Sequence, residues 1–366
     1  MDLSMVVSSR LLNEERYSEP DPPPVPAVFI FGDSTFDVGT NNFLLNQTKS
    51  KADMPFYGID YPHSKPTGRF SNKYNVADCI VQLLGYKESP PPFLYLVNND
   101  SEHFNTQILK GVNFAGGGAG ILQDTGIKRF GRVISMGEQV EQFSSVCSNM
   151  SEYLNASAAE SIINKSLFLI SVGSNDVNEF LFFNVSNSST LIHQLQQFLP
   201  FLMDNYQTHI KNLIKLGGRK FGILGAASLG CVPDVRETYN GSCSDEINFA
   251  AQEFNALLRL SLFELAFDFP QFKFSFADAY HISFAIINNP SRLRLSEVKK
   301  ACCGNQTLTG GTPCGPEATV CENRDEFLFW DRHHPTNYGS QLVALNLFNG
   351  GAEYMVPTNF SMLVKL

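Results

Sequence analysis

The sequence predicts an α/β protein of three layers, α/β/α, in which helices cover both faces of a mostly parallel sheet. Two observations lead to this fold class. Short, wholly apolar runs recur along the chain, as in strands that are buried on both faces. Between them lie longer segments with apolar residues at three- or four-residue spacing, as in amphipathic helices. Buried strands that alternate with helices favour a parallel sheet, because each crossover between parallel strands needs a long connection.

The predicted elements follow one another in a regular order. Strands are predicted at 27–31, 166–172, 220–225 and 272–276. The long helices are predicted at 191–213, where Pro200 is expected to introduce a kink, and at 247–267. In such sheets the functional residues gather in the loops after the strands. The chemistry of this protein is therefore expected in those loops.

The domain organisation is predicted to be simple. Residues 1–26 are polar and end in a proline-rich stretch that can extend but cannot pack, so we expect a flexible N-terminal arm. Nothing between 27 and 366 resembles a linker, which favours a single domain over that range.

Composition excludes two classes of function. The chain of 366 residues has 27 Lys and Arg against 36 Asp and Glu, a net charge of −9, and no basic run. Nucleic-acid binding depends on clustered basic residues, so we expect no nucleic-acid partner. No apolar stretch approaches the length of a membrane-spanning helix, so we expect no transmembrane segment. The oligomeric state stays open.

The 8 cysteines favour disulfide bonds over a metal site, because their spacings lack the close pairs of zinc motifs. Cys231 and Cys243 could close a local loop, whereas the other pairings stay open, and buried free thiols are the alternative. Asn-x-Ser/Thr sequons point in the same direction, toward a secreted glycoprotein. They lie at Asn46, Asn99, Asn149, Asn155, Asn164, Asn184, Asn187, Asn240, Asn305 and Asn359.

The first residues do not fit secretion. Residues 1–13 lack the apolar core of a signal peptide. We expect that the signal peptide is missing from this sequence or wrongly defined in it, and that the protein is extracellular. The alternative is a cytosolic protein with free thiols.

The sequence holds each part that acyl transfer by a serine requires: an activated hydroxyl, a base, a carboxylate and oxyanion donors. Ser34 follows the first predicted strand, where its hydroxyl can point out of the sheet edge. Asp331 and His334 are close enough in sequence for one turn to pair them, which leaves the second ring nitrogen for Ser34. The backbone N–H groups of Ser34 and Gly118 and the side-chain amide of Asn175 would form the oxyanion hole.

Seven stretches of the chain occur in an order typical of one family. They are 29–42, which contains Gly32-Asp33-Ser34, and 67–72, 112–120, 172–176, 229–233, 301–304 and 329–336, which contains Asp331 and His334. From about residue 26 onward, nearly the whole chain resembles the plant branch of the GDSL-motif esterases and lipases, within the SGNH hydrolase superfamily.

The resemblance implies a flavodoxin-like fold, secretion, and hydrolysis of lipid or other acyl esters through an acyl-enzyme on Ser34, with no metal or organic cofactor. It gives the five residues named above the same roles. Two departures stand out: Thr35 and Thr40 replace a leucine and an asparagine, and Gly116 stands where a serine is common. We expect the first to alter packing beneath the nucleophile, whereas the second leaves the neighbouring Gly117 open as the donor.

Several residues compete for these roles. Ser228 lies in a sequence like a nucleophile elbow, but Pro233 follows too closely for the chain to enter a helix directly, so a structural role is predicted. His333 is a rival to His334. Arg69 is predicted to be a structural clamp rather than a substrate ligand.

The loop around Ser34 contains two further carboxylates, Asp33 and Asp37, which are expected to hold the turn through backbone hydrogen bonds. Two alternative functions stay open. The same site could transfer acyl groups to an alcohol, or the protein could be a non-catalytic binder that keeps the fold.

Overall fold

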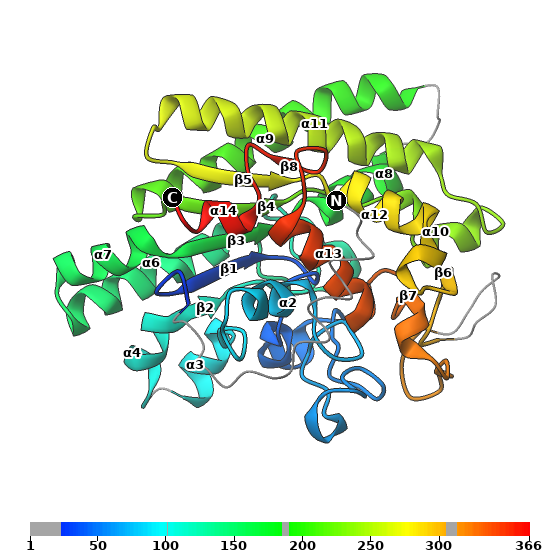
Figure 1. Ribbon diagram of the computed structural model, residues 1–366, viewed down its shortest axis with the longest axis horizontal. Helices are drawn as coiled ribbons and strands as arrows, with labels where there is room; N and C mark the ends of the chain where they lie inside the picture. Colours follow the sequence, from blue (N-terminus) through cyan, green and yellow to red (C-terminus); the bar gives the residue numbers. More distant parts are fainter. Residues whose placement is uncertain (1–22, 101, 185–189, 305–312) are drawn as a thin grey trace.

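The computed structural model describes residues 23–100, 102–184, 190–304 and 313–366. Its centre is a six-stranded sheet of order β2-β1-β3-β4-β5-β8, which Figure 1 shows crossing the molecule. The first five strands in this order are parallel, and β8 pairs antiparallel with β5. The strands are β1 Val28–Gly32, β2 Gly111–Asn113, β3 Leu167–Ser171, β4 Lys220–Leu224, β5 Lys273–Ala277 and β8 Met355–Val356.

The prediction of a mostly parallel sheet is confirmed. All four predicted strands are present, within one residue of the predicted bounds at either end. The strands β2 and β8 were not predicted. The order of the parallel strands, β2-β1-β3-β4-β5, is that of flavodoxin-like folds.

Side chains alternate between the two faces of the sheet. Phe29 and Phe31 of β1 point into a core with α6 (Met136–Tyr153), α9 (Leu191–Lys215) and α11 (Asp245–Asp268). Val28 and Ile30 point into a second core with α2 (Val76–Leu83), α13 (Asn337–Asn349) and α14 (Phe360–Leu363). Helices on both faces give the predicted three layers.

The two long predicted helices are α9, which contains Pro200, and α11. The other helices are α3 Phe93–Asn99, α4 Phe104–Gln107, α5 Ile127–Phe130, α7 Ala156–Lys165, α8 Ser174–Asn184, α10 Pro233–Thr238 and α12 Ala279–Asn288. A two-stranded sheet pairs β6 (Glu297–Ala301) with β7 (Phe327–Phe329). Short 3₁₀ helices lie at Thr40–Gln47, Pro62–Ser64, Ile108–Lys110, Leu229–Cys231, Pro290–Leu293 and Arg324–Glu326.

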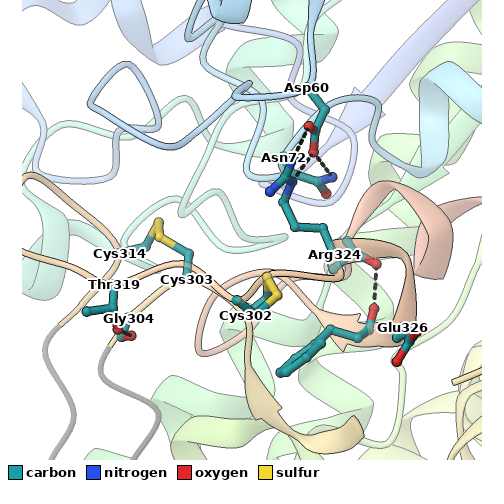
Figure 2. The surroundings of a disulfide bond; sticks show 12 residues. Asp60, Asn72, Cys302, Cys303, Gly304, Cys314, Thr319, Arg324 and Glu326 are labelled. Atoms are coloured by element: carbon teal, nitrogen blue, oxygen red, sulfur yellow. Dashed lines mark hydrogen bonds and ion pairs between the residues drawn. A yellow bond between two sulfur atoms is a disulfide. The ribbon is translucent and has the colours of Figure 1, made fainter. Parts of the chain in front are cut away.

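Six cysteines form three disulfides. The predicted local pair Cys231–Cys243 is present. The adjacent Cys302 and Cys303 pair with different partners, in Cys302–Cys321 and Cys303–Cys314. Figure 2 shows this region beside an ion pair, in which Arg324 donates twice to Asp60, at 2.7 Å each. The last two cysteines are free thiols. Cys79 is buried and Cys147 is half-buried.

The start of the fold differs slightly from the predicted boundary at residue 27. Val25 is buried, and its carbonyl oxygen accepts a hydrogen bond of 2.5 Å from the Tyr86 hydroxyl. Residues 1–22 of the predicted arm lie outside the described residues. Every helix in the described part of the chain is too short or too polar to cross a membrane.

Candidate active site

The predicted site residues converge at the carboxyl ends of the strands. Ser34 follows β1, Gly118 lies in the loop after β2, and Asn175 is in the first turn of α8, after β3. Asp331 and His334 come from the turn between β7 and α13. Because β2, β1 and β3 are parallel neighbours, their following loops meet at one edge of the sheet.

A chain of hydrogen bonds links the nucleophile, base and carboxylate candidates. His334 Nε2 lies 2.7 Å from Ser34 Oγ. On the other side of the ring, His334 Nδ1 lies 2.9 Å from both carboxylate oxygens of Asp331. This is the order of contacts in which an imidazole can take a proton from a serine while a carboxylate stabilises the resulting charge.

The Asp331 carboxylate is buried and fully bonded. Its Oδ1 accepts the backbone N–H groups of His333 and His334, each at 2.8 Å. Its Oδ2 accepts the hydroxyl of Tyr57 at 2.8 Å. The sequence did not indicate Tyr57, because no local pattern connects it to a residue so far along the chain.

Asp331 and His334 each stabilise the charged form of the other. Burial alone would raise the pKa of the Asp331 carboxyl group, but the facing His334 holds it below its ordinary range. Burial alone would lower the pKa of the His334 imidazole, but the charge and hydrogen bond of Asp331 raise it above its ordinary value. Asp331 therefore stays ionised, and His334 is a stronger base than a free imidazole.

The turn that carries Ser34 is held by the two carboxylates expected to hold it. Asp33 Oδ1 accepts the N–H of Thr35 at 2.9 Å. Asp37 Oδ1 accepts the N–H groups of Gly39 and Thr40, each at 2.7 Å. Gly32 precedes this turn at φ 140°, where a Cβ would lie 2.1 Å from the Ser171 carbonyl oxygen.

The contacts of Gly117 and Gly118 distinguish these two candidate donors. The N–H of Gly117 donates to Asp37 Oδ2 at 2.9 Å, so it is already used. Among the described residues, neither the N–H of Gly118 nor that of Ser34 has an acceptor. The contacts therefore favour Gly118 over Gly117 as an oxyanion donor.

The side chain of Asn175 is fixed in this loop. Its Nδ2 donates to the Ala119 carbonyl oxygen at 2.9 Å, which leaves the second amide hydrogen for another acceptor. The next residue, Asp176, accepts the N–H groups of Ile121 and Leu122 at 2.9 and 3.0 Å. These bonds tie the start of α8 to the glycine loop.

All five candidates line one cleft of about 450 Å³. Its wall is largely apolar, with contributions from Leu224, Ile286, Leu328, Phe329 and Val343. A second hollow of about 520 Å³ shares residues with it, among them Phe130 and Asn175. The cleft thus has room for an apolar group beside Ser34.

The rival residues have other partners. Ser228 also lines the cleft, but its Oγ accepts a hydrogen bond of 2.9 Å from Ser283 and contacts no imidazole among the described residues. The ring of His333 lies 3.9 Å from Asp234. Arg69 is buried and donates twice to Asp78, at 2.7 and 2.9 Å, as expected of a clamp.

An Asp-x-x-His pair alone does not define the site. His103 and His281 each contact an aspartate three residues earlier, at 2.8 Å, yet both histidines are exposed. What distinguishes His334 is its contact with Ser34 and a side chain that is only 16% exposed. In the described part of the chain, no three His, Cys, Asp or Glu side chains are grouped as a metal site would require.

A parallel α/β sheet with linked serine, histidine and aspartate side chains at its carboxyl edge is typical of serine hydrolases. The comparison with known families agrees with this class. Residues 28–347 match the family described as GDSL-like Lipase/Acylhydrolase. The chain belongs to this family and is a carboxylic ester hydrolase.

Curated relatives from Arabidopsis thaliana are named GDSL esterase/lipases. GDSL esterase/lipase At4g28780 is 36% identical over 343 residues, which cover 93% of this chain and 91% of the relative. GDSL esterase/lipase At5g37690 is 36% identical over 323 residues, 88% of each chain. GDSL esterase/lipase LTL1 is 34% identical over 344 residues, which cover 93% of this chain and 91% of the relative.

Proposed function

We propose that the protein is a secreted serine esterase or lipase that hydrolyses acyl esters through an acyl-enzyme on Ser34. The observation that carries the proposal is the continuous hydrogen-bonded chain from Ser34 through His334 to Asp331 at an apolar cleft. Its geometry is that of a nucleophile and base ready for proton transfer.

The reaction would proceed in two halves. Ser34 Oγ attacks the ester carbonyl while His334 Nε2 takes the hydroxyl proton, and Asp331 stabilises the imidazolium. The tetrahedral oxyanion accepts hydrogen bonds from the N–H groups of Ser34 and Gly118 and from the amide of Asn175. His334 then donates its proton to the leaving alcohol. Water attacks the acyl carbon while His334 takes its proton, and the second tetrahedral intermediate breaks the bond to Ser34 Oγ, which regains the proton from His334 as the carboxylic acid leaves.

The test is substitution of the nucleophile with a matched serine as the control. Ser34→Ala should lower turnover of a short p-nitrophenyl ester by roughly 10⁴-fold or more. Ser228→Ala removes the other serine hydroxyl considered for the nucleophile, which bonds to Ser283 and to no imidazole in the described part of the chain, and should therefore lose far less activity than Ser34→Ala. A fluorophosphonate probe should add its mass to the wild type but not to Ser34→Ala. Wild-type-like turnover in Ser34→Ala contradicts the proposal.

The chemistry of the substrate is proposed from the cleft. The apolar wall formed by residues such as Ile286, Leu328 and Val343 suits the acyl group of an ester. A panel of p-nitrophenyl esters of increasing acyl length should therefore show a KM that falls before it rises. Free acid as the main product in excess alcohol supports hydrolysis, whereas a new ester as the main product indicates the acyltransferase alternative.

Secretion and glycosylation belong to the same proposal, and three disulfides support an oxidising compartment. Among the sequons, Asn99, Asn155 and Asn240 are exposed. Asn359 is half-buried, and its Nδ2 donates to the Gly350 carbonyl oxygen at 3.0 Å. Asn149 and Asn164 are also half-buried. The side chains of Asn46 and Asn184 lie outside the described part of the structure, and Asn187 and Asn305 lie wholly outside it.

Peptide mapping of the protein from its native tissue, with enzymatic deglycosylation, tests this part. Glycans are expected at the three exposed sites and not at Asn359, whose acceptor nitrogen is already bonded. Unmodified asparagines together with eight free thiols would place the protein in the cytosol and leave the catalytic proposal unchanged.

A single domain over 27–366 completes the proposal, and limited proteolysis should leave that range as one resistant core.

A further inference from the structure

We infer that Tyr57 is a positioning residue of the catalytic site, which fixes the Asp331 carboxylate and partly neutralises its charge. The inference rests on the proposed function, because it assigns to Tyr57 an action through Asp331 and His334. Tyr57 lies in a loop between the 3₁₀ helices 40–47 and 62–64, far from the catalytic turn in sequence.

The direction of the Tyr57–Asp331 bond is fixed by chemistry. The two oxygens are 2.8 Å apart, and both side chains are buried. An ionised carboxylate can only accept, so the tyrosine hydroxyl is the donor. Burial and the charge of Asp331 both raise the pKa of Tyr57, which keeps its proton in place. Tyr57 is therefore a permanent donor to Asp331.

The two oxygens of Asp331 have different partners. Oδ1 is held by the backbone N–H groups of residues 333 and 334, whereas Oδ2 receives Tyr57 from a distant segment. Both oxygens are also within reach of His334 Nδ1. Without the tyrosine hydroxyl, His334 would be the remaining donor to Oδ2. The carboxylate could rotate, and its full charge would act on the imidazole.

The segment that carries Tyr57 also supports His334. The ring of Phe70 lies 4.8 Å from the His334 ring, centre to centre, and 6.1 Å from the ring of Tyr57. Ser71 Oγ donates to the Pro335 carbonyl oxygen at 3.2 Å. Residues 57–71 thus contact Asp331, His334 and Pro335.

Further contacts fix this segment to the part of the chain that contains the catalytic turn. Tyr57 packs in a small core with Trp330 and the cysteines of the two neighbouring disulfides. Figure 2 shows the ion pair between Asp60 and Arg324, to which Asn72 adds a hydrogen bond of 2.8 Å. Asn72 Oδ1 in turn accepts the N–H of Asn337 at 2.7 Å. The hydroxyl of Tyr57 is therefore presented to Asp331 by a rigid support.

A positioning role and a packing role predict different results for Tyr57→Phe. If Tyr57 only fills space, the phenylalanine changes stability and leaves the pH profile where it was. If Tyr57 shares the charge of Asp331, its loss exposes His334 to more negative charge and raises the pKa of the imidazole further. Since the base must be unprotonated, the acid limb of kcat/KM then moves to higher pH.

The experiment compares Tyr57→Phe with Tyr61→Phe. Tyr61 lies in the same segment, its ring packs against Arg69, and its hydroxyl has no partner among the described residues. The kcat/KM of a short p-nitrophenyl ester is measured from pH 5 to 9, with active sites counted by fluorophosphonate labelling. Tyr57→Phe should lower kcat by about tenfold per labelled site, the effect of one hydrogen bond to a charged group, and should shift the acid limb upward. Tyr61→Phe should match the wild type in both.

Unchanged kcat and an unchanged acid limb in Tyr57→Phe would overturn the inference. So would an equal shift in Tyr61→Phe, because the effect would then not depend on contact with Asp331. Ser34→Ala separates this outcome from failure of the proposed function. If Ser34→Ala is inactive while Tyr57→Phe behaves as the wild type, only the role of Tyr57 is wrong.

Discussion

The amide of Asn175 allows a sharp test of the proposed oxyanion hole. One amide hydrogen is used in the 2.9 Å bond to the Ala119 carbonyl oxygen, so the amide plane is fixed and its other hydrogen can face the substrate. Asn175→Ala removes both donors. Asn175→Asp keeps the shape but replaces the donor with an oxygen that faces the carbonyl of Ala119 and the developing oxyanion.

The expected magnitude follows from these contacts. Loss of one oxyanion donor lowers kcat by about 10²–10³, or about 2.7–4 kcal/mol, with little change in KM. Loss of the bond to Ala119 removes only about 1 kcal/mol of folding free energy. Asn175→Asp should be at least as slow as Asn175→Ala, because a negative charge opposes the oxyanion.

Steady-state kinetics on a soluble p-nitrophenyl ester, with the unfolding midpoint measured in parallel, give both quantities. A loss of less than about tenfold in Asn175→Ala would show that the amide does not act on the transition state. An aspartate variant faster than the alanine variant would contradict the assigned orientation of the amide. A large fall in the unfolding midpoint of Asn175→Ala would show that its activity is lost because the protein unfolds more readily.

Three further predictions concern the catalytic base, a disulfide in the core beside the site, and the glycine loop. Because Asp331 raises the pKa of His334 above the usual 6.5, kcat/KM should fall as the pH falls through that raised value, and Asp331→Asn should move this limb to lower pH in a pH–rate profile. Replacing Cys302 and Cys321 by serine should cost about 3 kcal/mol of unfolding free energy in denaturant titrations, since this disulfide closes a loop with a sequence separation of 19. Gly118→Ala should lower kcat at least tenfold, or by about 1.4 kcal/mol, because the residue has φ 83° and a Cβ would lie 2.7 Å from the Phe130 ring, which would displace the N–H donor. Unchanged kinetics in Gly118→Ala would show that the loop accepts a Cβ here without moving the N–H of residue 118.

The sequence predicted the elements whose signals are local. Strands β1, β3, β4 and β5 are short apolar runs, and their burial on both faces is the reason that they are apolar throughout. Strand β2 has only 3 residues, Gly111–Asn113. Its last residue, Asn113, already belongs to the glycine-rich stretch, so the sequence pattern there did not indicate a strand. Strand β8 has two residues, too few for any periodicity.

The same distinction applies to the site. Asp331 and His334 are neighbours in sequence, so their pairing could be predicted, whereas Tyr57 is 274 residues from Asp331 and lies in an irregular loop. Choosing between Gly117 and Gly118 required the contact with Asp37, which no spacing rule reveals. Local chemistry was therefore predictable, and the partners that reach it from distant loops were not.

The contact between Ser34 and His334 spans 300 residues of the chain. During synthesis, Ser34 leaves the ribosome with the first strand of the sheet, and His334 follows only after the long stretch of chain between them. Partly made chains can begin to fold from the N-terminus, but they cannot assemble the hydrogen-bonded chain on which the proposed activity depends. The order of residues would thus delay the proposed activity until the segment that carries His334 has been made.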